Sequence, residues 1–166
     1  MKIKGTLTLV LGVALVSLIF PSCSRKEFKS TLACKDISNG LKSEFSVPYG
    51  EFDEYTTEEL NFLFSSPEDY EDISVIYSSD STDVCELGVI YASDNESAKR
   101  IYEDAKLYIK NLQEQKSEFL RNYSPQELSK LNSAEAKCYG NYVIFAVADQ
   151  DTKNDIFDKA EKLLSK

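Results

Sequence analysis

The residue best placed to do chemistry is Cys23, which lies at the end of an uncharged apolar run. Lys2 and Lys4 give the chain a basic start, and residues 5–24 then carry no charge. Pro21 breaks any helix just before the cysteine, because it has no N–H to donate and its ring clashes with the preceding turn. This layout is typical of a secretory signal peptide. The chemistry expected here is proteolytic cleavage beside a thiol.

The end of this leader resembles the lipobox of bacterial lipoproteins. The small Ser22 precedes Cys23, whereas Phe20 stands where a lipobox usually has Leu, and Pro21 is also not its commonest residue. The resemblance implies that the Cys23 thiol carries diacylglycerol, and that the lipid, with palmitate as a typical acyl chain, holds the mature N-terminus on the membrane. Ordinary cleavage and an uncleaved anchor stay open, although the run at 7–20 is short for a membrane span.

Carboxylates are the second set of residues that could do chemistry. The acidic cluster at 68–72 could bind a cation, but hard cations need roughly six to eight oxygens around one point. The chain has no Asp-x-Asp-x-Asp-Gly loop, and residues 149–151 are the nearest fragment. Acidic pairs within 51–59 could do acid–base work if one member were buried with a raised pKa, but their polar neighbours indicate a solvated surface. We therefore expect neither a metal nor a cofactor.

Tyrosines could form a binding surface, since they combine a large contact area with few rotatable bonds. The chain has ten of them, and Tyr49, Tyr55, Tyr70 and Tyr77 lie near the acidic segments. Ordinary packing in strands and helices is the alternative.

Three cysteines besides Cys23 remain, namely Cys34, Cys85 and Cys138. None forms a Cys-x-x-Cys pair, so a redox motif and a zinc knuckle are not indicated. We expect three buried thiols. A disulfide between Cys85 and Cys138 stays open, because both lie at the starts of predicted strands and an extracytoplasmic location allows the bond.

Composition excludes several classes of function. The chain has 28 acidic and 19 basic residues, for a net charge of −9, and loss of Lys2 and Lys4 with the leader makes it more negative. An acidic surface repels nucleic acid, so no nucleic-acid partner is expected. The chain also has no histidine. This removes the commonest zinc ligand and every catalytic triad that depends on histidine, and we predict that the protein is not an enzyme.

Five helices are expected from periodicity and capping signals. The first lies at 31–45, and a second follows the capping box at 56–59. The longest begins at the capping signal of 93–96 and continues to about residue 120. A short helix opens at 124–127, and the last is capped by Asp151.

Three strands are expected, at 73–77, 85–92 and 142–148. The first two are separated by a short loop and read as an antiparallel hairpin. The third is apolar throughout and therefore central. Residues 51–55 read as an acidic loop, and residues 137–141 as a lead-in with a bulge at its Gly-Asn pair.

These elements predict an α+β fold in which a small, mostly antiparallel, three-stranded sheet carries the long helix and the C-terminal helix on one face, with two shorter helices leading. The expected organisation is a signal peptide at 1–22, a lipidated tether at 23–30 and a single domain at 31–166. The mature chain is too short for the two-lobed solute-binding fold.

From residue 61 onward the order of elements resembles domain-of-unknown-function family 4358, whose members are small extracytoplasmic bacterial domains and often lipoproteins. Three landmarks carry the resemblance: the acidic segment at 67–72, the strand at 87–91, and the run at 137–143 before an apolar strand. The resemblance implies a fold and a location. It transfers no site residues.

The function expected from the sequence is that of a membrane-anchored extracytoplasmic lipoprotein with lipid attachment at Cys23. Because the anchor precedes one small domain without catalytic motifs, we expect a non-enzymatic module that binds a protein or another component of the cell envelope. The alternative is an envelope hydrolase that depends on carboxylates alone. The sequence does not identify the ligand.

Overall fold

The computed structural model describes residues 28, 31–45, 51–64 and 67–165. Cys23 and Tyr49 lie outside the described residues. The described chain is α+β, as predicted, with its elements in this order: α1 (Cys34–Lys42), β1 (Phe52–Glu54), α2 (Thr57–Leu63), the 3₁₀ turn η1 (Pro67–Asp69), β2 (Tyr70–Ser78), β3 (Glu86–Ala92), α3 (Asn95–Tyr123), α4 (Pro125–Ser133), β4 (Glu135–Tyr139), β5 (Tyr142–Val147) and α5 (Gln150–Leu164).

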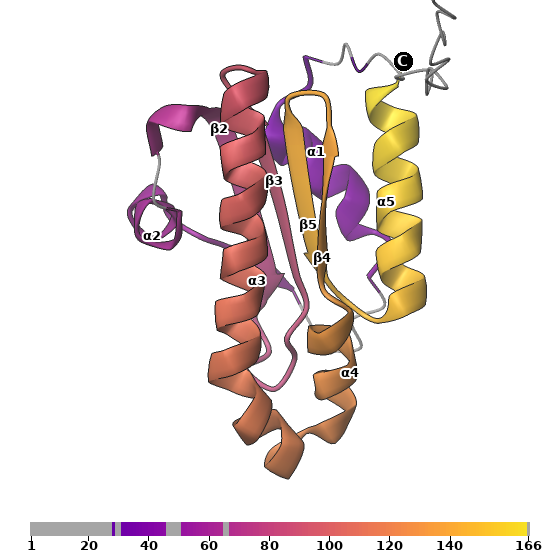
Figure 1. Cartoon of the computed structure of the whole chain (residues 1–166). Helices are drawn as coiled ribbons and strands as arrows, with labels where there is room; N and C mark the ends of the chain where they lie inside the picture. The colour runs from indigo at the N-terminus through magenta and orange to yellow at the C-terminus, as the bar shows by residue number, and fades with distance from the viewer. Residues whose placement is uncertain (1–27, 29–30, 46–50, 65–66, 166) are drawn as a thin grey trace, which may run out of the picture.

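The strands form one antiparallel sheet in the order β1-β2-β3-β5-β4 (Figure 1). The prediction of three strands is wrong, because the described residues contain five. The predicted hairpin is confirmed as β2–β3, and the apolar strand β5 is paired on both sides, by β3 and β4. A continuous apolar run suits such an interior strand, because it is buried on both faces.

The two missed strands are the edges of the sheet. β1 has three residues, two of them exposed acids, and reads as a loop because an edge strand needs little apolar surface. The prediction of a lead-in with a bulge at 137–141 is wrong, because β4 and the turn after it occupy these residues. Instead, Tyr139 pairs with Tyr142, and the intervening Gly140 and Asn141 form a two-residue hairpin turn. Gly140 supplies the positive φ of +63° that the first position of a type II′ turn requires.

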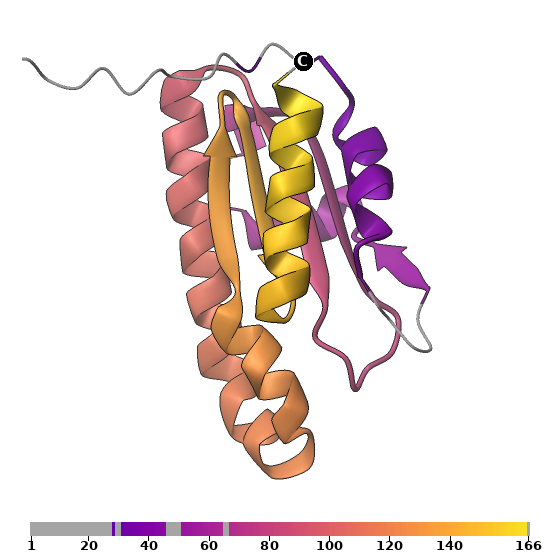
Figure 2. The same ribbon diagram turned by 90° about the vertical axis from the view of Figure 1, so that its right-hand side faces the viewer.

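The long helix and the C-terminal helix lie on opposite faces of the sheet, so the prediction that both pack on one face is also wrong (Figure 2). Alternation along β5 shows the division: Ile144 points into the core with α1 and α5, whereas Val143 and Phe145 point into the core with α2 and α3. Because β3 and β5 are apolar on both faces, both faces must be covered.

Local signals in the sequence explain where the helices begin. Asp94 caps α3 by accepting a hydrogen bond from the Ser97 amide at 2.7 Å, and Pro125 occupies the first turn of α4. The last helix is capped by Asp149 rather than by the predicted Asp151. Within the described ranges, no helix has the length and apolarity needed to cross a membrane.

Candidate functional site

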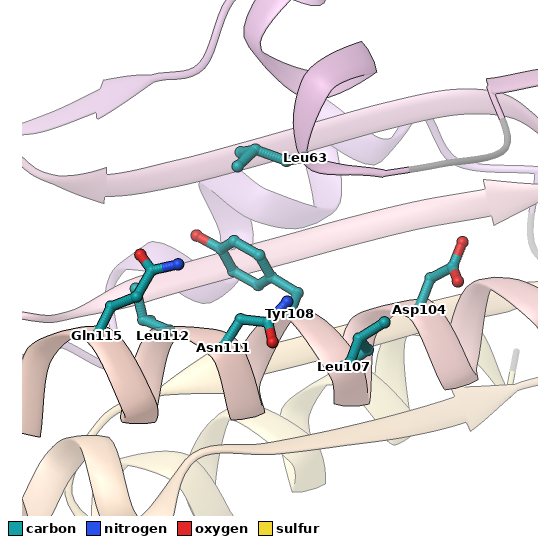
Figure 3. A pocket seen from close by; sticks show the side chains of 7 residues that line it. All are labelled: Leu63, Asp104, Leu107, Tyr108, Asn111, Leu112 and Gln115. Carbon is teal, nitrogen blue, oxygen red and sulfur yellow. The ribbon is translucent and has the colours of Figure 1, made fainter.

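Three adjoining hollows lie along α2, α3 and the start of β3, and neighbouring hollows share a lining residue. The first has a volume of about 290 Å³ and the second, under α2, about 380 Å³; both are lined by Leu63. The third has a volume of about 360 Å³ and shares Tyr55 with the second. Figure 3 shows the first hollow, with the Tyr108 ring rising from α3 and Leu63 facing it from α2. We call the whole the α2–α3 groove.

The third hollow, which we call the Glu86 hollow, lies where β2 and β3 meet α3. Its lining residues are Tyr55, Tyr77, Ser78, Ser79, Asp80, Ser81, Asp83, Val84, Cys85, Glu86 and Lys116. Most of them are polar. The groove therefore changes from apolar near Leu63 to polar and acidic at this end.

Glu86 is the most unusual residue of the groove, because its carboxyl group is only 3 % exposed. It lies at the start of β3 on the face covered by α3, where the Tyr108 hydroxyl donates a hydrogen bond of 2.7 Å to its Oε1. Burial raises the pKa of Glu86 to about 7, against the opposing effects of the Tyr108 hydrogen bond and the positive charge of Lys116. This carboxyl group therefore changes charge near neutral pH.

Two tyrosines form the wall beside Glu86. Tyr77 on β2 pairs with Glu86 in the sheet register, and the Tyr55 ring packs on Tyr77 with centroids 4.4 Å apart. Burial raises the pKa of Tyr55 to about 12, and burial together with the neighbouring Glu86 raises that of Tyr108. Tyr55 and Tyr108 are therefore neutral hydrogen-bonding groups at physiological pH.

The floor under Tyr108 is the Phe145 ring, with centroids 5.4 Å apart. Phe145 lies across Gly88, where an added Cβ would be 1.9 Å from the ring. Glycine at this position of β3 therefore lets the ring approach the backbone, which supports Tyr108 from below.

An ionic network fixes the loop that leads into β3. Lys130 on α4 lies 3.0 Å from both Asp83 and Glu127, and Glu127 also accepts a hydrogen bond from the Val84 amide. Burial alone would raise the pKa of Asp83, but hydrogen bonds from Cys85 and Lys130 outweigh it and lower the pKa. The network holds this wall of the Glu86 hollow against α4.

The acidic cluster at 68–72 has structural partners. Both carboxylate oxygens of Asp69 accept hydrogen bonds from Arg100, and Asp72 accepts one from the Cys34 amide at 2.6 Å. No group of three or more metal-ligating side chains occurs among the residues that the structure describes. Asp69 and Asp72 of this cluster therefore brace the fold, whereas Glu68 and Glu71 are exposed.

Of the four singled-out tyrosines, the structure brings two together. Tyr55 and Tyr77 meet in the groove, whereas the Tyr70 hydroxyl binds Asn61 at 3.0 Å and Tyr49 lies outside the described residues. Of the acids at 51–59, Glu59 completes the capping box with Thr56, and Glu54 pairs with Lys35 at 2.6 Å.

The three described cysteines are free thiols. Burial raises the pKa of Cys34, and it raises that of Cys85 to about 12, so both are inert. Cys138 is exposed, contrary to the expectation of three buried thiols. It lies on β4, whose edge position leaves one side open.

Glu86 was not singled out from the sequence. Its signal is a single acid inside an otherwise apolar strand, which indicates a buried carboxyl group only once that face of the sheet is known to be covered.

Comparison with known proteins identifies one family. The family model described as "domain of unknown function (DUF4358)" matches residues 47–148. No curated protein and no solved structure is similar enough to count as a match. The matched span begins before residue 61, where the resemblance was expected to start, and it ends before α5. It contains every residue that lines the α2–α3 groove. Because the match covers more than half of the chain, this protein belongs to domain-of-unknown-function family 4358.

Proposed function

We propose that this protein is a membrane-tethered, extracytoplasmic binding module whose ligand enters the α2–α3 groove. The observation that carries the proposal is the groove itself, which places the buried Glu86 carboxyl group beside Tyr55 and Tyr77. Ligand sites are typically concave and apolar with a few placed polar groups. A buried carboxyl group lowers the stability of the fold, and such groups are found mainly where they serve a function.

The tether in this proposal rests on the leader. Lipidation of Cys23 would hold the domain on the outer side of the cell membrane, within reach of proteins and other envelope components. A domain that is concentrated at a surface needs only modest intrinsic affinity for partners held there, because tethering raises their effective concentration.

Site-specific photo-crosslinking in intact cells tests the binding role. A photoreactive amino acid replaces Leu107, which lines the groove and is 54 % exposed, or Phe119, which is 58 % exposed on the same helix outside the groove lining. The full chain with its leader is expressed. We expect an adduct with one envelope component from position 107 and none from position 119. Equal adducts at both positions, or none at either, would contradict the proposal.

The second candidate is a carboxylate-dependent envelope hydrolase, and the elevated pKa of Glu86, about 7, favours it as a general acid. Glycoside hydrolysis usually needs a second carboxylate. Asp83, a half-buried acid of the same hollow, is instead held by Lys130 and by the Cys85 amide. Incubation of purified envelope material with the protein decides between the two candidates: release of soluble fragments by wild type but not by Glu86→Gln would establish the hydrolase.

A further inference from the structure

We propose that the Glu86 hollow binds a primary ammonium group, as carried by a lysine side chain of a basic peptide segment. This inference rests on the proposed binding function and names the chemistry that the groove would recognise.

Glu86 has a hydrogen-bond donor on only one of its two carboxylate oxygens among the described residues. Its Oε1 accepts from Tyr108, whereas its Oε2 accepts no hydrogen bond from any residue that the structure describes. Among the described residues the one fully buried side-chain oxygen or nitrogen without a partner is Ser38 Oγ, so Oε2 is not fully buried and is in contact with the hollow that Glu86 lines. Since Glu86 lines the hollow, a ligand in the hollow can supply the missing donor, and an ammonium group supplies three.

A pair of packed aromatic rings lies in the hollow beside Glu86. Tyr55 and Tyr77 line the same hollow as Glu86, and their packed rings are inclined by 35°. Aromatic faces attract cations, most strongly where water is excluded. A carboxylate beside two phenol rings therefore favours a cation over a neutral or anionic ligand.

The side chains that line the groove are mostly negatively charged. Its three hollows are lined by five further acids, Glu58, Glu59, Asp80, Asp83 and Asp104, and by one cation, Lys116. Lys116 lies on the exposed side of α3 and makes no ion pair within 4 Å with a described residue. It competes weakly for Glu86 and can move aside when a ligand ammonium enters.

Calorimetric titration of the full chain in micelles of an uncharged detergent tests the inference. The probe is acetyl-trilysine amide, and its control is the same peptide with every ε-amino group acetylated. We expect trilysine to bind and the acetylated peptide not to bind. Glu86→Gln should weaken binding roughly tenfold or more, because it removes a charge-assisted hydrogen bond, whereas Lys116→Gln should strengthen binding.

Glu118→Gln is the matched control, since it removes one negative charge from an exposed position of α3 outside the groove. Equal weakening by Glu86→Gln and Glu118→Gln would show non-specific attraction and overturn the inference, as would failure of trilysine to bind. Glu86→Gln removes no packing, and circular dichroism checks that each variant is folded.

The pH dependence gives an independent readout. The titratable and charged groups that face Glu86 are Tyr55, Tyr77, Tyr108 and Lys116. The raised pKa values of Tyr55 and Tyr108 keep these two phenols neutral between pH 5.5 and 8. Affinity for trilysine should therefore fall severalfold from pH 8 to pH 5.5 as Glu86 gains a proton, and affinity that is constant over this range would contradict the inference. If Leu107 crosslinks a partner but trilysine does not bind, the binding function stands and the ammonium specificity fails.

Discussion

At the scale of single residues, Glu86 dominates the behaviour expected of this protein. Its carboxyl group is buried by the Tyr108 ring, by α3 and by the sheet, and one hydrogen bond of 2.7 Å does not replace the water that it has lost. The folded protein therefore holds the proton of Glu86 more tightly than the unfolded chain does. Stability and ligand binding both depend on this proton, but in opposite directions: the neutral form stabilises the fold, and the charged form binds a cation.

Replacement of Glu86 by Gln should stabilise the protein at neutral and alkaline pH. The pKa of Glu86 is 4.5 in the unfolded reference and about 7 in the folded protein. Its stabilising contribution is therefore complete below pH 4.5 and is lost as the pH rises through 7. The glutamine variant has no proton to lose at this position. The difference in unfolding free energy, Glu86→Gln minus wild type, should therefore increase by roughly 3 kcal/mol from pH 4.5 to pH 8.

Urea unfolding at several pH values, followed by circular dichroism, measures this difference. Glu118→Gln, an exposed substitution on the same helix, should stay within about 0.5 kcal/mol of wild type throughout. A pH-independent difference between wild type and Glu86→Gln would show that the Glu86 carboxyl group is solvated in the folded protein.

At the scale of elements, the strongest local signals predict the fold well. The capping box at Thr56 and the cap at Asp94 mark helix starts that the structure confirms, and β-branched residues mark the β2–β3 hairpin. The edge strands β1 and β4 escape prediction because they are short and half solvated, so their pairing depends on neighbours rather than on their own residues.

The error about the two faces of the sheet and the failure to find Glu86 have one cause. Cys85, Leu87 and Val89 alternate along β3 and lie on one face of the sheet, where they are buried against α1 and α5. If helices covered that face alone, Glu86 would point to solvent and need no explanation. Because α3 covers the opposite face, the same alternation buries Glu86. Which face a helix covers is decided by tertiary packing, which the period of a single strand does not contain.

Strand β3 depends on glycine at one position, and a pair of substitutions tests this. In Gly88→Ala the new Cβ would lie 1.9 Å from the Phe145 ring, so the ring must move and disturb Tyr108 above it. We expect a loss of about 1 to 3 kcal/mol, as for other overpacked cores. In Gly40→Ala the new Cβ would lie 3.8 Å from Leu163 Cδ1, an ordinary contact distance, and α1 should gain up to about 1 kcal/mol from alanine.

Thermal or urea unfolding of both variants compares the two substitutions under the same conditions. A Gly88→Ala variant as stable as wild type would mean that the Phe145 ring does not lie against the β3 backbone. Loss of trilysine binding in Gly88→Ala, with binding retained in Gly40→Ala, would link the position of this ring to the groove.

At the scale of the whole molecule, Phe28 and the Glu86 hollow lie at opposite ends of the sheet. Phe28 packs against Tyr139 and Gly140 at the β4–β5 turn. Tyr91 pairs with Tyr142 beside that turn, whereas Glu86 pairs with Val147 at the other end of β3. Five residues of strand separate these ends by roughly 17 Å. A domain tethered through its N-terminus would therefore hold this hollow away from the membrane.

This orientation requires that Cys23 be the lipid-bearing N-terminus. Labelling with radioactive palmitate, in cells that express the full chain, tests the requirement. Wild type should incorporate label, and Cys23→Ser should not, because a serine hydroxyl does not form the thioether. Cys138→Ser is the matched control: it removes the exposed thiol of the folded domain and should leave labelling unchanged. The N-terminal peptide of the mature protein should begin at Cys23 and carry the added mass of the lipid. An unmodified N-terminus at another residue would show ordinary cleavage. The domain would then not be tethered by a lipid, and nothing would hold the Glu86 hollow away from the membrane.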